Sequence, residues 1–513
     1  MHCNCNIRAL HRSNKQATLF RFRQNNPIIR TTLLVVISAG IISLGSPVSA
    51  AETIESPPSK SDPMLFFDSQ DLTVRGHFQF GVNAVAERNL FWDLAELATG
   101  NIEFDSDENW LEIYTEPGIS FERHISPHSS WFGKVSAVAS YTAGTDAFAA
   151  SNIGSVTIEE IYLGYRTTLT DEWNIEASFG PRMLKLGTGM LIANGGSDGF
   201  ERGALKFGPR EAWGKAAIVQ LTGSGIKATA FYLAPNEIPS NDTKNLFNGI
   251  DLRWDGEDGS YTGLTYIHVI KSEAAYPKAA PSGVGAPTII ADARAKLNAV
   301  NFYGKKERVD GDLSNLSLAL DVTYEWNDRI NLRAWGGRIK SEYVFTRYSW
   351  RPTLGYSYQI FSGDNPNTSR IERFDPLYYD GSPSTWATGS KSAMVFINSN
   401  VQSHNLSVRI TPTMQDTITL RYAHVRAFEL RSPLQFGQAT RLDFSNGLSS
   451  VVSGVTNAHL SDDFFLEYNR VVTPNVYLTA GLSISIPGAG ITGAAGGNAP
   501  NWIGGFINVV FNY

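Results

Sequence analysis

Hydrophobic and polar residues alternate with a period of two along most of this chain. In residues 316–326 most side chains at even positions are apolar, while the odd positions include Asp321, Thr323 and Glu325. Similar alternation runs through 72–83, 349–360 and 476–486, whereas helical periodicity is nearly absent. Because successive side chains of a strand point to opposite faces, the pattern predicts an all-β protein.

The alternating segments are long for a soluble protein. They run for roughly 9 to 15 residues, whereas strands in globular proteins average five or six. About 9–11 residues are needed to cross a bilayer at a tilt. The polar phase also carries full charges, which a water-filled lumen accepts more readily than a packed interior. We therefore predict a transmembrane antiparallel β-barrel, with a secreted β-sandwich or β-helix as the alternative.

The spacing of the segments predicts about 18 strands. Their expected ranges are 74–86, 109–123, 130–143, 155–169, 173–187, 211–222, 225–234, 247–255, 260–271, 297–305, 314–326, 329–342, 345–361, 402–411, 416–429, 460–472, 475–487 and 502–513. Strand ends read in this way are imprecise by a few residues, so 16 strands is a second interpretation.

The connections alternate in length as well. Those after even-numbered strands are short, and most of those after odd-numbered strands are long. The long ones include 84–108, 188–210, 272–296, 362–401 and 430–459. Outer-membrane barrels have short periplasmic turns, long external loops and, with an even strand number, both termini in the periplasm. The two-residue Asn327-Asp328 connection breaks the pattern. Loops 272–296 and 362–401 are long enough to fold inward or to cap the mouth.

The last strand carries a separate signal. Its apolar residues share one face with the final aromatic residue: Ile503, Ile507, Val509, Phe511 and Tyr513. This ending resembles the signal by which outer-membrane barrels are recognised by their assembly machinery. It predicts a Gram-negative-type outer membrane as the location. The expected partners are that machinery, membrane lipid and lipopolysaccharide.

The first 51 residues have the pattern of an export signal. A basic stretch from Arg8 to Arg30 precedes the 12-residue apolar run Leu33–Leu44, and small residues around Ala50 offer a cleavage site. This run is shorter than the ~20 residues of a spanning helix. We predict a signal peptide at 1–51, a short periplasmic segment at 52–72 and the barrel at 73–513. An N-terminal membrane anchor is the alternative.

Charge and cysteine content narrow the function. Six of the 43 basic residues, and none of the 49 acidic ones, lie in residues 1–51, which leaves the remainder with 37 against 49. Such an acidic chain is a poor match for nucleic acid, which needs a basic face. The two cysteines, Cys3 and Cys5, also lie in residues 1–51. A barrel without thiols suits an oxidising compartment.

No motif in the chain predicts catalysis. Beyond residue 51 there are seven histidines, and none lies in a Gly-x-Ser-x-Gly or His-Glu-x-x-His pattern. Residues 362–366, Ser-Gly-Asp-Asn-Pro, have the chemistry of a turn, and calcium binding there is the alternative. We predict no enzyme activity, no cofactor and no metal site. Eighteen strands enclose an aqueous pore, so we predict a diffusion channel. A general or other substrate-specific porin and an adhesive or structural barrel are the alternatives.

Tryptophans near strand ends are typical of the aromatic girdles of membrane barrels. They predict a set of residues at the two membrane interfaces: Trp110, Trp131, Trp173, Trp213, Trp254, Trp326 and Trp502.

Residues 329–379 carry a family resemblance. They contain, in order, Ala334-Trp335, Arg351-Pro352, the strand pattern Leu354-Gly355-Tyr356-Ser357-Tyr358, Ser362-Gly363-Asp364 and Phe374-Asp375-Pro376-Leu377-Tyr378. This segment resembles the alginate-export family of outer-membrane porins. A weaker echo spans 179–187, where Pro181 interrupts the family's Gly-Arg-Gln-x-Leu strand. The resemblance implies a monomeric barrel of 18 strands with an electropositive constriction that passes an anionic polysaccharide.

The inward phase of the predicted strands supplies the candidate pore-lining residues. The basic ones are Arg75, Lys134, Arg166, Arg182, Arg253, Arg351, Arg409 and Arg421. The same phase carries the acidic residues Glu112, Glu160, Glu176, Asp251, Asp321, Glu325 and Glu467. The two sets nearly cancel, so two arrangements are open. Either the charges pair evenly around the wall, or the arginines gather at one constriction and select anions. The resemblance favours the second.

Overall fold

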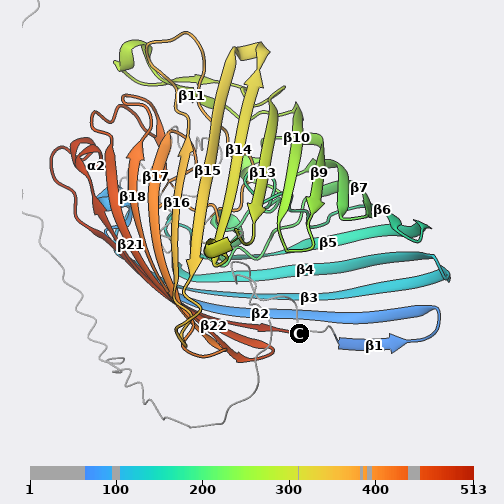
Figure 1. Ribbon diagram of the computed structural model, residues 1–513. Coiled ribbons are helices and arrows are strands. Elements are labelled where there is room, and N and C mark those ends of the chain that lie inside the picture. The colour runs from blue at the N-terminus through green and yellow to red at the C-terminus, as the bar shows by residue number, and fades with distance from the viewer. Residues whose placement is uncertain (1–63, 95–103, 310, 382–384, 390–395, 437–450) are drawn as a thin grey trace, which may run out of the picture. The chain divides into compact units, whose positions relative to one another are not determined.

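The computed structural model describes residues 64–94, 104–309, 311–381, 385–389, 396–436 and 451–513 (Figure 1). The predicted signal peptide, 1–51, and most of the predicted segment 52–72 lie outside the described residues.

Long strands dominate the described part of the chain. The barrel strands are β2 (Leu72–Arg88), β3 (Glu108–Ser126), β4 (Ser129–Thr145), β5 (Ser151–Thr170), β6 (Trp173–Phe179), β7 (Lys215–Gly223), β8 (Ile226–Ala234), β9 (Leu246–Asp255), β10 (Tyr261–Lys271), β13 (Asn298–Lys306), β14 (Leu316–Asn327), β15 (Leu332–Val344), β16 (Thr353–Phe361), β17 (Val401–Ile410), β18 (Asp416–Ala427), β21 (His459–Thr473), β22 (Val476–Pro487) and β23 (Trp502–Asn512).

Shorter elements lie between and before these strands. They are β1 (Met64–Asp68), β11 (Tyr276–Lys278), β12 (Thr288–Ile290), β19 (Leu434–Gln435), β20 (Val451–Val452), helix α2 (Ala489–Ala494) and the 3₁₀ turns η1 (Leu90–Asp93), η2 (Phe200–Arg202), η3 (Pro239–Asn241), η4 (Pro281–Gly283), η5 (Gly311–Leu313) and η6 (Asp328–Ile330). Among the described residues, no helix has the length and apolar character needed to span a membrane.

The main sheet closes on itself. Each barrel strand pairs antiparallel with the next along the chain, and β2 pairs with β23, where Val82 lies opposite Val509. The described residues therefore form a closed antiparallel barrel of 18 strands, which confirms the predicted fold class. The additional strand β1 pairs with β2 beyond the end of β23, with Met64 opposite Gly76 (Figure 1).

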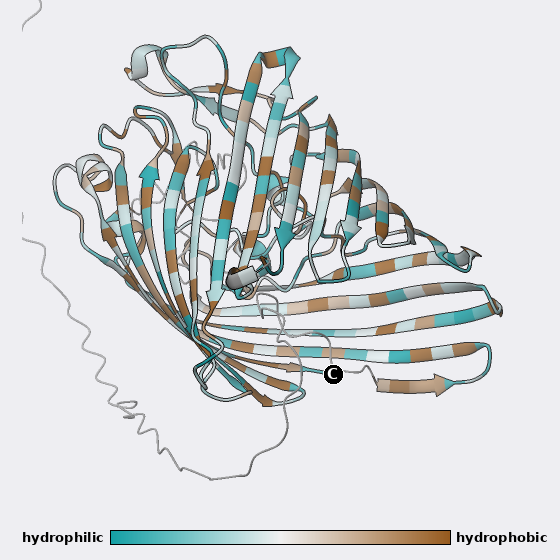
Figure 2. Cartoon of the chain, viewed as in Figure 1, coloured by the Kyte–Doolittle hydropathy of each residue, from teal (hydrophilic) through white to brown (hydrophobic). Residues whose placement is uncertain are grey.

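The two faces of the wall differ in polarity. On β14 the side chains of Leu320, Val322 and Tyr324 are exposed, while those of Asp321 and Glu325 are buried. Figure 2 shows this banding of apolar and polar residues along the long strands. Apolar side chains outside and polar ones inside are what a barrel in a bilayer requires.

Some predicted strand ends are wrong. β16 begins at Thr353, and the preceding residues, including Arg351, form the turn after β15. β6 ends at Phe179 rather than at 187. There Gly180 adopts φ of 119°, and a Cβ on it would lie 2.2 Å from the carbonyl oxygen of Ile161. Only glycine fits this position, and the chain leaves the wall at this point.

The long connections fold back against the inner wall. Met190, Leu191, Leu377 and Trp386, all from connections, are buried in the hydrophobic core. The indole nitrogen of Trp386 donates to the backbone oxygen of Thr188 (3.0 Å), so two distant connections touch each other. The main core of this protein therefore lies inside the barrel, where the connections meet the polar face of the wall.

Candidate functional site

The inner wall carries most of the predicted pore-lining residues, and most of them are paired. Six of the eight basic residues form ion pairs: Lys134 with Glu160 and Glu116, Arg166 with Glu122 and Glu176, Arg182 with Glu176, Arg253 with Asp255, Arg409 with Glu342, and Arg421 with Glu467. This arrangement corresponds to the evenly paired wall rather than to a ring of arginines alone.

The other two predicted residues have different positions. Arg75 lies on the inward phase of β2, opposite Ser120 of β3, and is half-buried. Arg351 lies outside the barrel strands, in the turn between β15 and β16, with a left-handed backbone (φ 46°) and an exposed side chain. The structure therefore does not bring Arg351 together with the wall residues.

Several basic residues lie close to the end of the barrel with short connections. Arg409 is next to the last residue of β17, Arg253 lies two residues before the end of β9, and Arg166 lies four residues before the end of β5. The guanidinium of Arg166 also lies over the ring of Phe132, 4.4 Å from its centroid. At this end the lumen is lined by arginine–carboxylate pairs that are partly exposed.

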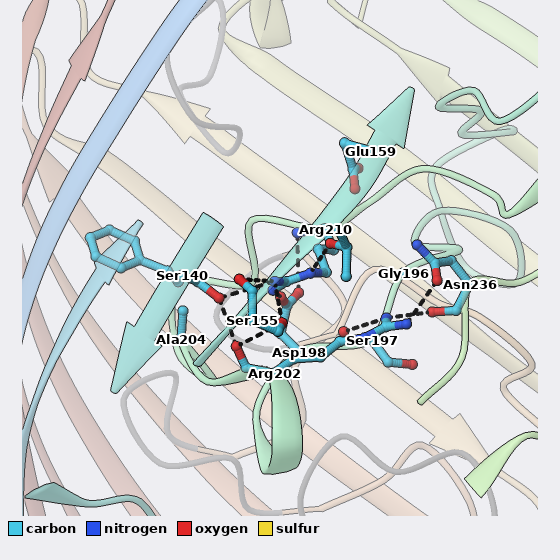
Figure 3. A network of polar contacts seen from close by, with 12 residues as sticks. Ser140, Ser155, Glu159, Gly196, Ser197, Asp198, Arg202, Ala204, Arg210 and Asn236 are labelled. Atoms are coloured by element: carbon cyan, nitrogen blue, oxygen red, sulfur yellow. Dashed lines mark hydrogen bonds and ion pairs between the residues drawn. The ribbon is translucent and has the colours of Figure 1, made fainter. Parts of the chain in front are cut away.

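The connection between β6 and β7 crosses the lumen and is anchored by Arg210. The guanidinium of this fully buried residue donates to Thr157 Oγ1 (2.7 Å). It also donates to Asp198 Oδ1 (2.7 Å) and to the hydroxyls of Ser140 and Ser155 (3.0 Å each), as Figure 3 shows. Asp198 and Arg210 belong to the connection, and the three hydroxyls belong to β4 and β5. One arginine therefore fixes the connection to the wall.

A second arginine of this connection has backbone partners. Arg202 donates to the carbonyl oxygens of Ser197 (3.0 Å) and Asn236 (2.8 Å), as Figure 3 shows, and to that of Glu237 (3.0 Å). Its own carbonyl oxygen accepts from Ser140 Oγ (2.7 Å). Arg202 thus connects the β6–β7 and β8–β9 connections, and the lumen is narrowed by an ordered structure.

Two carboxyl groups of this connection are held in environments that oppose ionisation. Desolvation of Glu211, reinforced by the charge of Asp380, raises its pKa to about 7. Burial raises the pKa of Asp198 to about 6, although the charge and hydrogen bonds of Arg210 act in the opposite direction. The charge of the lumen therefore changes between mildly acidic and neutral pH.

A buried ion pair joins the β10–β13 and β16–β17 connections. Arg294 donates to both oxygens of Asp375, from Nε at 2.7 Å and from Nη2 at 2.9 Å, and both side chains are inaccessible to solvent. Tyr276 also donates to Asp375, whose backbone N–H donates to Glu325 on the wall (2.9 Å). Burial is the largest single influence on Asp375 and acts to raise its pKa. The charge and hydrogen bonds of Arg294, the charge of Arg373 and the hydrogen bond from Tyr276 together outweigh it and lower that pKa.

The β16–β17 connection also reaches the wall through Trp386. The guanidinium of Arg338, on β15, lies 3.8 Å from the centroid of the Trp386 ring and donates to the backbone oxygen of Thr385 (2.6 Å). Thr188 of the β6–β7 connection donates to Asp321 on β14 (2.6 Å). These contacts show that the described residues of the connection between β16 and β17 fold inward.

An aromatic cluster lies where the first connection meets the barrel. Trp92 packs edge-on against Trp502, with ring centroids 5.5 Å apart, and contacts Phe396 and Phe436. Trp110, Trp213 and Trp502 are buried, so their predicted place in an interfacial girdle is wrong. Trp131 and Trp254 are exposed, as a girdle requires.

Sequence reasoning missed the residues that hold the connections in the lumen. Arg202, Arg210 and Arg294 lie outside the alternating segments, so periodicity did not select them. Asp375 lies in the Phe-Asp-Pro-Leu-Tyr segment that the family resemblance had singled out, and that segment was the one available signal.

Among known proteins, similarity to this chain is found with solved structures at low sequence identity. A search among curated proteins finds no match. Solved structures similar to the chain include OccK11 (OpdR) of Pseudomonas aeruginosa, with 11% identity, 86% of this chain and 95% of that chain covered, and a TM-score of 0.45. Another is outer-membrane OmpT of Vibrio cholerae, with 10% identity, coverage of 87% and 99%, and a TM-score of 0.36. OmpF of Salmonella typhi, in complex with daunomycin, has 8% identity, coverage of 86% and 98%, and a TM-score of 0.39.

The family comparison is decisive. The sequence model described as "Alginate export" matches residues 140–440. This range covers more than half of the chain and includes the connections anchored by Arg210 and Arg294. The closed barrel described here is an outer-membrane channel, and the chain belongs to the alginate export family.

Proposed function

We propose that this channel passes anionic or polar solutes, and that its preferred substrate class is an anionic polysaccharide such as alginate. The observation that carries the proposal is the unequal exposure of the two partners in the ion pairs that Arg166, Arg409 and Arg421 form on the inner wall. The exposed fraction is 46% for Arg166 against 27% and 22% for its two glutamates. It is 28% for Arg409 against 15% for Glu342, and 23% for Arg421 against 14% for Glu467.

Because the guanidinium is the more exposed partner in these pairs, a passing solute contacts positive charge first. Arginine is suited to this role, since its planar fork binds carboxylates with two hydrogen bonds and stays charged at any physiological pH. Fixed charges in a narrow lumen select permeant ions by sign. The overall acidity of the chain does not prevent such a path, because the glutamates paired with Arg166, Arg409 and Arg421 are less exposed than these arginines. The pair of Arg253 (30% exposed) and Asp255 (48%) is the opposite case.

We further propose an orientation and a set of partners. Tyr513 pairs with Phe78 at the end of the barrel that has the short connections, and outer-membrane barrels place short turns in the periplasm. Both termini are therefore assigned to the periplasm. The expected partners are lipid and lipopolysaccharide on the outer face, the barrel assembly machinery and the solute. The barrel closes without a strand from another chain, which supports a monomer.

Planar-bilayer recording tests the proposal. The reversal potential in a KCl gradient should show anion preference for the wild type. A triple variant, Arg166→Gln with Arg409→Gln and Arg421→Gln, should shift it towards cations, and added alginate oligomers should block its current less strongly. Arg470→Gln is the matched control. Arg470 also forms an ion pair, with Asp416 of β18 (3.0 Å), but it lies on the outward phase of β21 and does not face the lumen.

Three results would contradict the proposal. Cation preference in the wild type, or an unchanged reversal potential in the triple variant, would leave a general porin. A reconstituted barrel that never conducts would favour the adhesive or structural alternative.

A further inference from the structure

A row of polar side chains crosses the outward face of four neighbouring strands. Tyr358 of β16 lies opposite His404 of β17, His404 opposite His424 of β18, and His424 opposite Asp462 of β21. The same strands present Leu406, Leu420, Phe464 and Leu466 on this face, closer to the short connections, and all four are exposed. The polar row thus borders the apolar surface at the end with the long connections, where polar groups on the lipid face cost little.

A bulge brings one more histidine, His459, to this row. The register between β18 and β21 shifts after the pair Val425–Ser461, so that Arg426 lies opposite His459. Leu460 and Ser461 are both buried on the inner side. Because of the extra residue, His459 and Asp462 share the outward face although they are three positions apart.

His424, His459 and Asp462 converge on one point. His424 Nδ1 lies 2.8 Å from Asp462 Oδ1, and His459 Nε2 lies 2.9 Å from Asp462 Oδ2. The two imidazole rings stack with centroids 4.8 Å apart and an interplanar angle of 29°. Each side chain is 28–31% exposed, so the group is accessible from outside the barrel. Tyr422 donates to the same carboxylate (2.7 Å).

We propose that His424, His459 and Asp462 form a binding site for one divalent transition-metal cation, with Zn²⁺ the best fit. Their three ligand atoms all lie within 4.8 Å of one another. Two imidazoles and one carboxylate suit zinc, which takes nitrogen and oxygen ligands in a tetrahedral set with a fourth position open to water. Calcium and magnesium prefer sites made of oxygen ligands. A lipid phosphate is disfavoured because Asp462 lies at the centre of the group.

The site would connect β18 to β21, which are separated in sequence by the connection 428–458. His424 belongs to the strand before this connection, while His459 and Asp462 belong to the strand after it. A bound cation would therefore fasten the wall at the base of that connection. This role is independent of what the lumen transports.

Metal binding by the full-length barrel without a histidine tag tests the site. Isothermal titration with Zn²⁺ in detergent should give one equivalent bound, and Co²⁺ should give the visible absorption of a four-coordinate site. His424→Ala and Asp462→Asn should each weaken Zn²⁺ binding at least tenfold. His404→Ala is the matched control: it lies beside His424 on the same face, but its ring contacts Tyr356 and Tyr358 rather than a carboxylate.

The result that supports the site is a Zn²⁺-dependent rise in melting temperature for the wild type and for His404→Ala, but not for Asp462→Asn. Heat-modifiable gel mobility verifies that each variant is folded. If His424→Ala does not fold, the nearly isosteric Asp462→Asn decides the question. The proposal is overturned if the wild type binds no stoichiometric Zn²⁺, if Asp462→Asn binds as tightly as the wild type, or if His404→Ala loses binding equally. The first two results would leave a hydrogen-bonded triad only.

Discussion

Arg210 shows how single residues decide the interior of this barrel. It is fully buried, and its guanidinium is matched by one carboxylate, Asp198, and by hydroxyl groups of the wall. Removing one partner of a buried ion pair typically costs about 3–5 kcal/mol, because the remaining charge is left uncompensated. Lysine could not replace this arginine, since it has no planar fork to reach several acceptors at once.

At the same scale, Glu211 predicts a pH dependence of selectivity. Desolvation and the charge of Asp380 raise the pKa of Glu211 to about 7. The charges of Glu116 and Asp198 also act to raise it, while that of Lys185 acts to lower it. Below pH 7 Glu211 is neutral, and above it the lumen gains a negative charge. Anion preference should therefore fall as the pH rises through about 7. Glu211→Gln should reduce this fall and leave the part that comes from Asp198, whose pKa is about 6. Reversal potentials between pH 5.5 and 8.5, a range of roughly one and a half units on either side of that pKa, measure the effect.

Two observations would contradict this assignment. One is a pH dependence that is the same in Glu211→Gln as in the wild type, which would place the titrating group elsewhere. The other is an anion preference that rises with pH. The free energy of unfolding should also fall as the pH rises. Because the pKa of Glu211 is raised in the folded state, its contribution to stability is complete at low pH and is lost as the pH rises towards 7.

Among the elements, the strands could be predicted from the sequence and their irregularities could not. Alternation locates all 18 barrel strands in order, because one face meets lipid and the other meets polar groups. It fails where the backbone departs from regular pairing. The pairing of β4 with β5 shifts register between Val135 and Ala137, because β5 carries one extra residue at this point. The consecutive residues Glu159 and Glu160 of β5 are therefore both buried. Period-two reasoning places only one of them inside.

The candidate site was predicted in part for the same reason. Arg166, Arg409 and Arg421 lie on regular strands, so their inward direction follows from the alternation. Arg351 was misplaced because Trp350 and Pro352 extend the alternating pattern into a turn. Trp213 was misread because a tryptophan near a predicted strand end has the same local sequence whether it packs inside or outside.

The connections form elements of their own, and the pair Arg294–Asp375 joins two of them. We expect Arg294→Ala to cost about 3–5 kcal/mol, because it removes the hydrogen-bonded counter-charge of the buried Asp375 carboxylate and leaves only the more weakly acting Arg373. Combining it with Asp375→Asn should cost less than the sum of the two single changes. Urea unfolding followed by tryptophan fluorescence, with limited proteolysis of the connections, measures both effects.

Lys306→Ala provides the control for this cycle. Lys306 pairs with Asp258 at 2.8 Å, but both side chains are 46% exposed, and exposed pairs contribute little to stability. Strict additivity of the Arg294 and Asp375 changes, or a loss in Lys306→Ala as large as that in Arg294→Ala, would show that the buried pair does not hold the two connections together.

For the molecule as a whole, the bore depends on the connections more than on the number of strands. An 18-strand barrel encloses an aqueous lumen when nothing fills it. Here Arg210 fixes one connection inside that lumen, Arg294 fixes two others, and Trp386 joins the β6–β7 connection to the β16–β17 connection. Because these polar contacts are buried, we infer that the connections are fixed walls of the path rather than a gate that opens each time a solute passes.

Trp386 allows this view of the bore to be tested. Its ring is fully buried and lies over Arg338, while its indole N–H bonds to the connection that carries Thr188. Trp386→Ala should destabilise the protein by about 3–5 kcal/mol, the usual cost of truncating a buried tryptophan. It should also raise the single-channel conductance by tens of per cent, because it removes one ring and releases the guanidinium of Arg338 without emptying the lumen.

Trp335→Ala is the matched control. Trp335 lies on β15, the strand that carries Arg338, but it is exposed on the outer face. The conductance of Trp335→Ala should equal that of the wild type. Equal conductance in Trp386→Ala and the wild type would show that the constriction lies elsewhere along the path, and the arginine pairs near the short connections would then be the place to look for it.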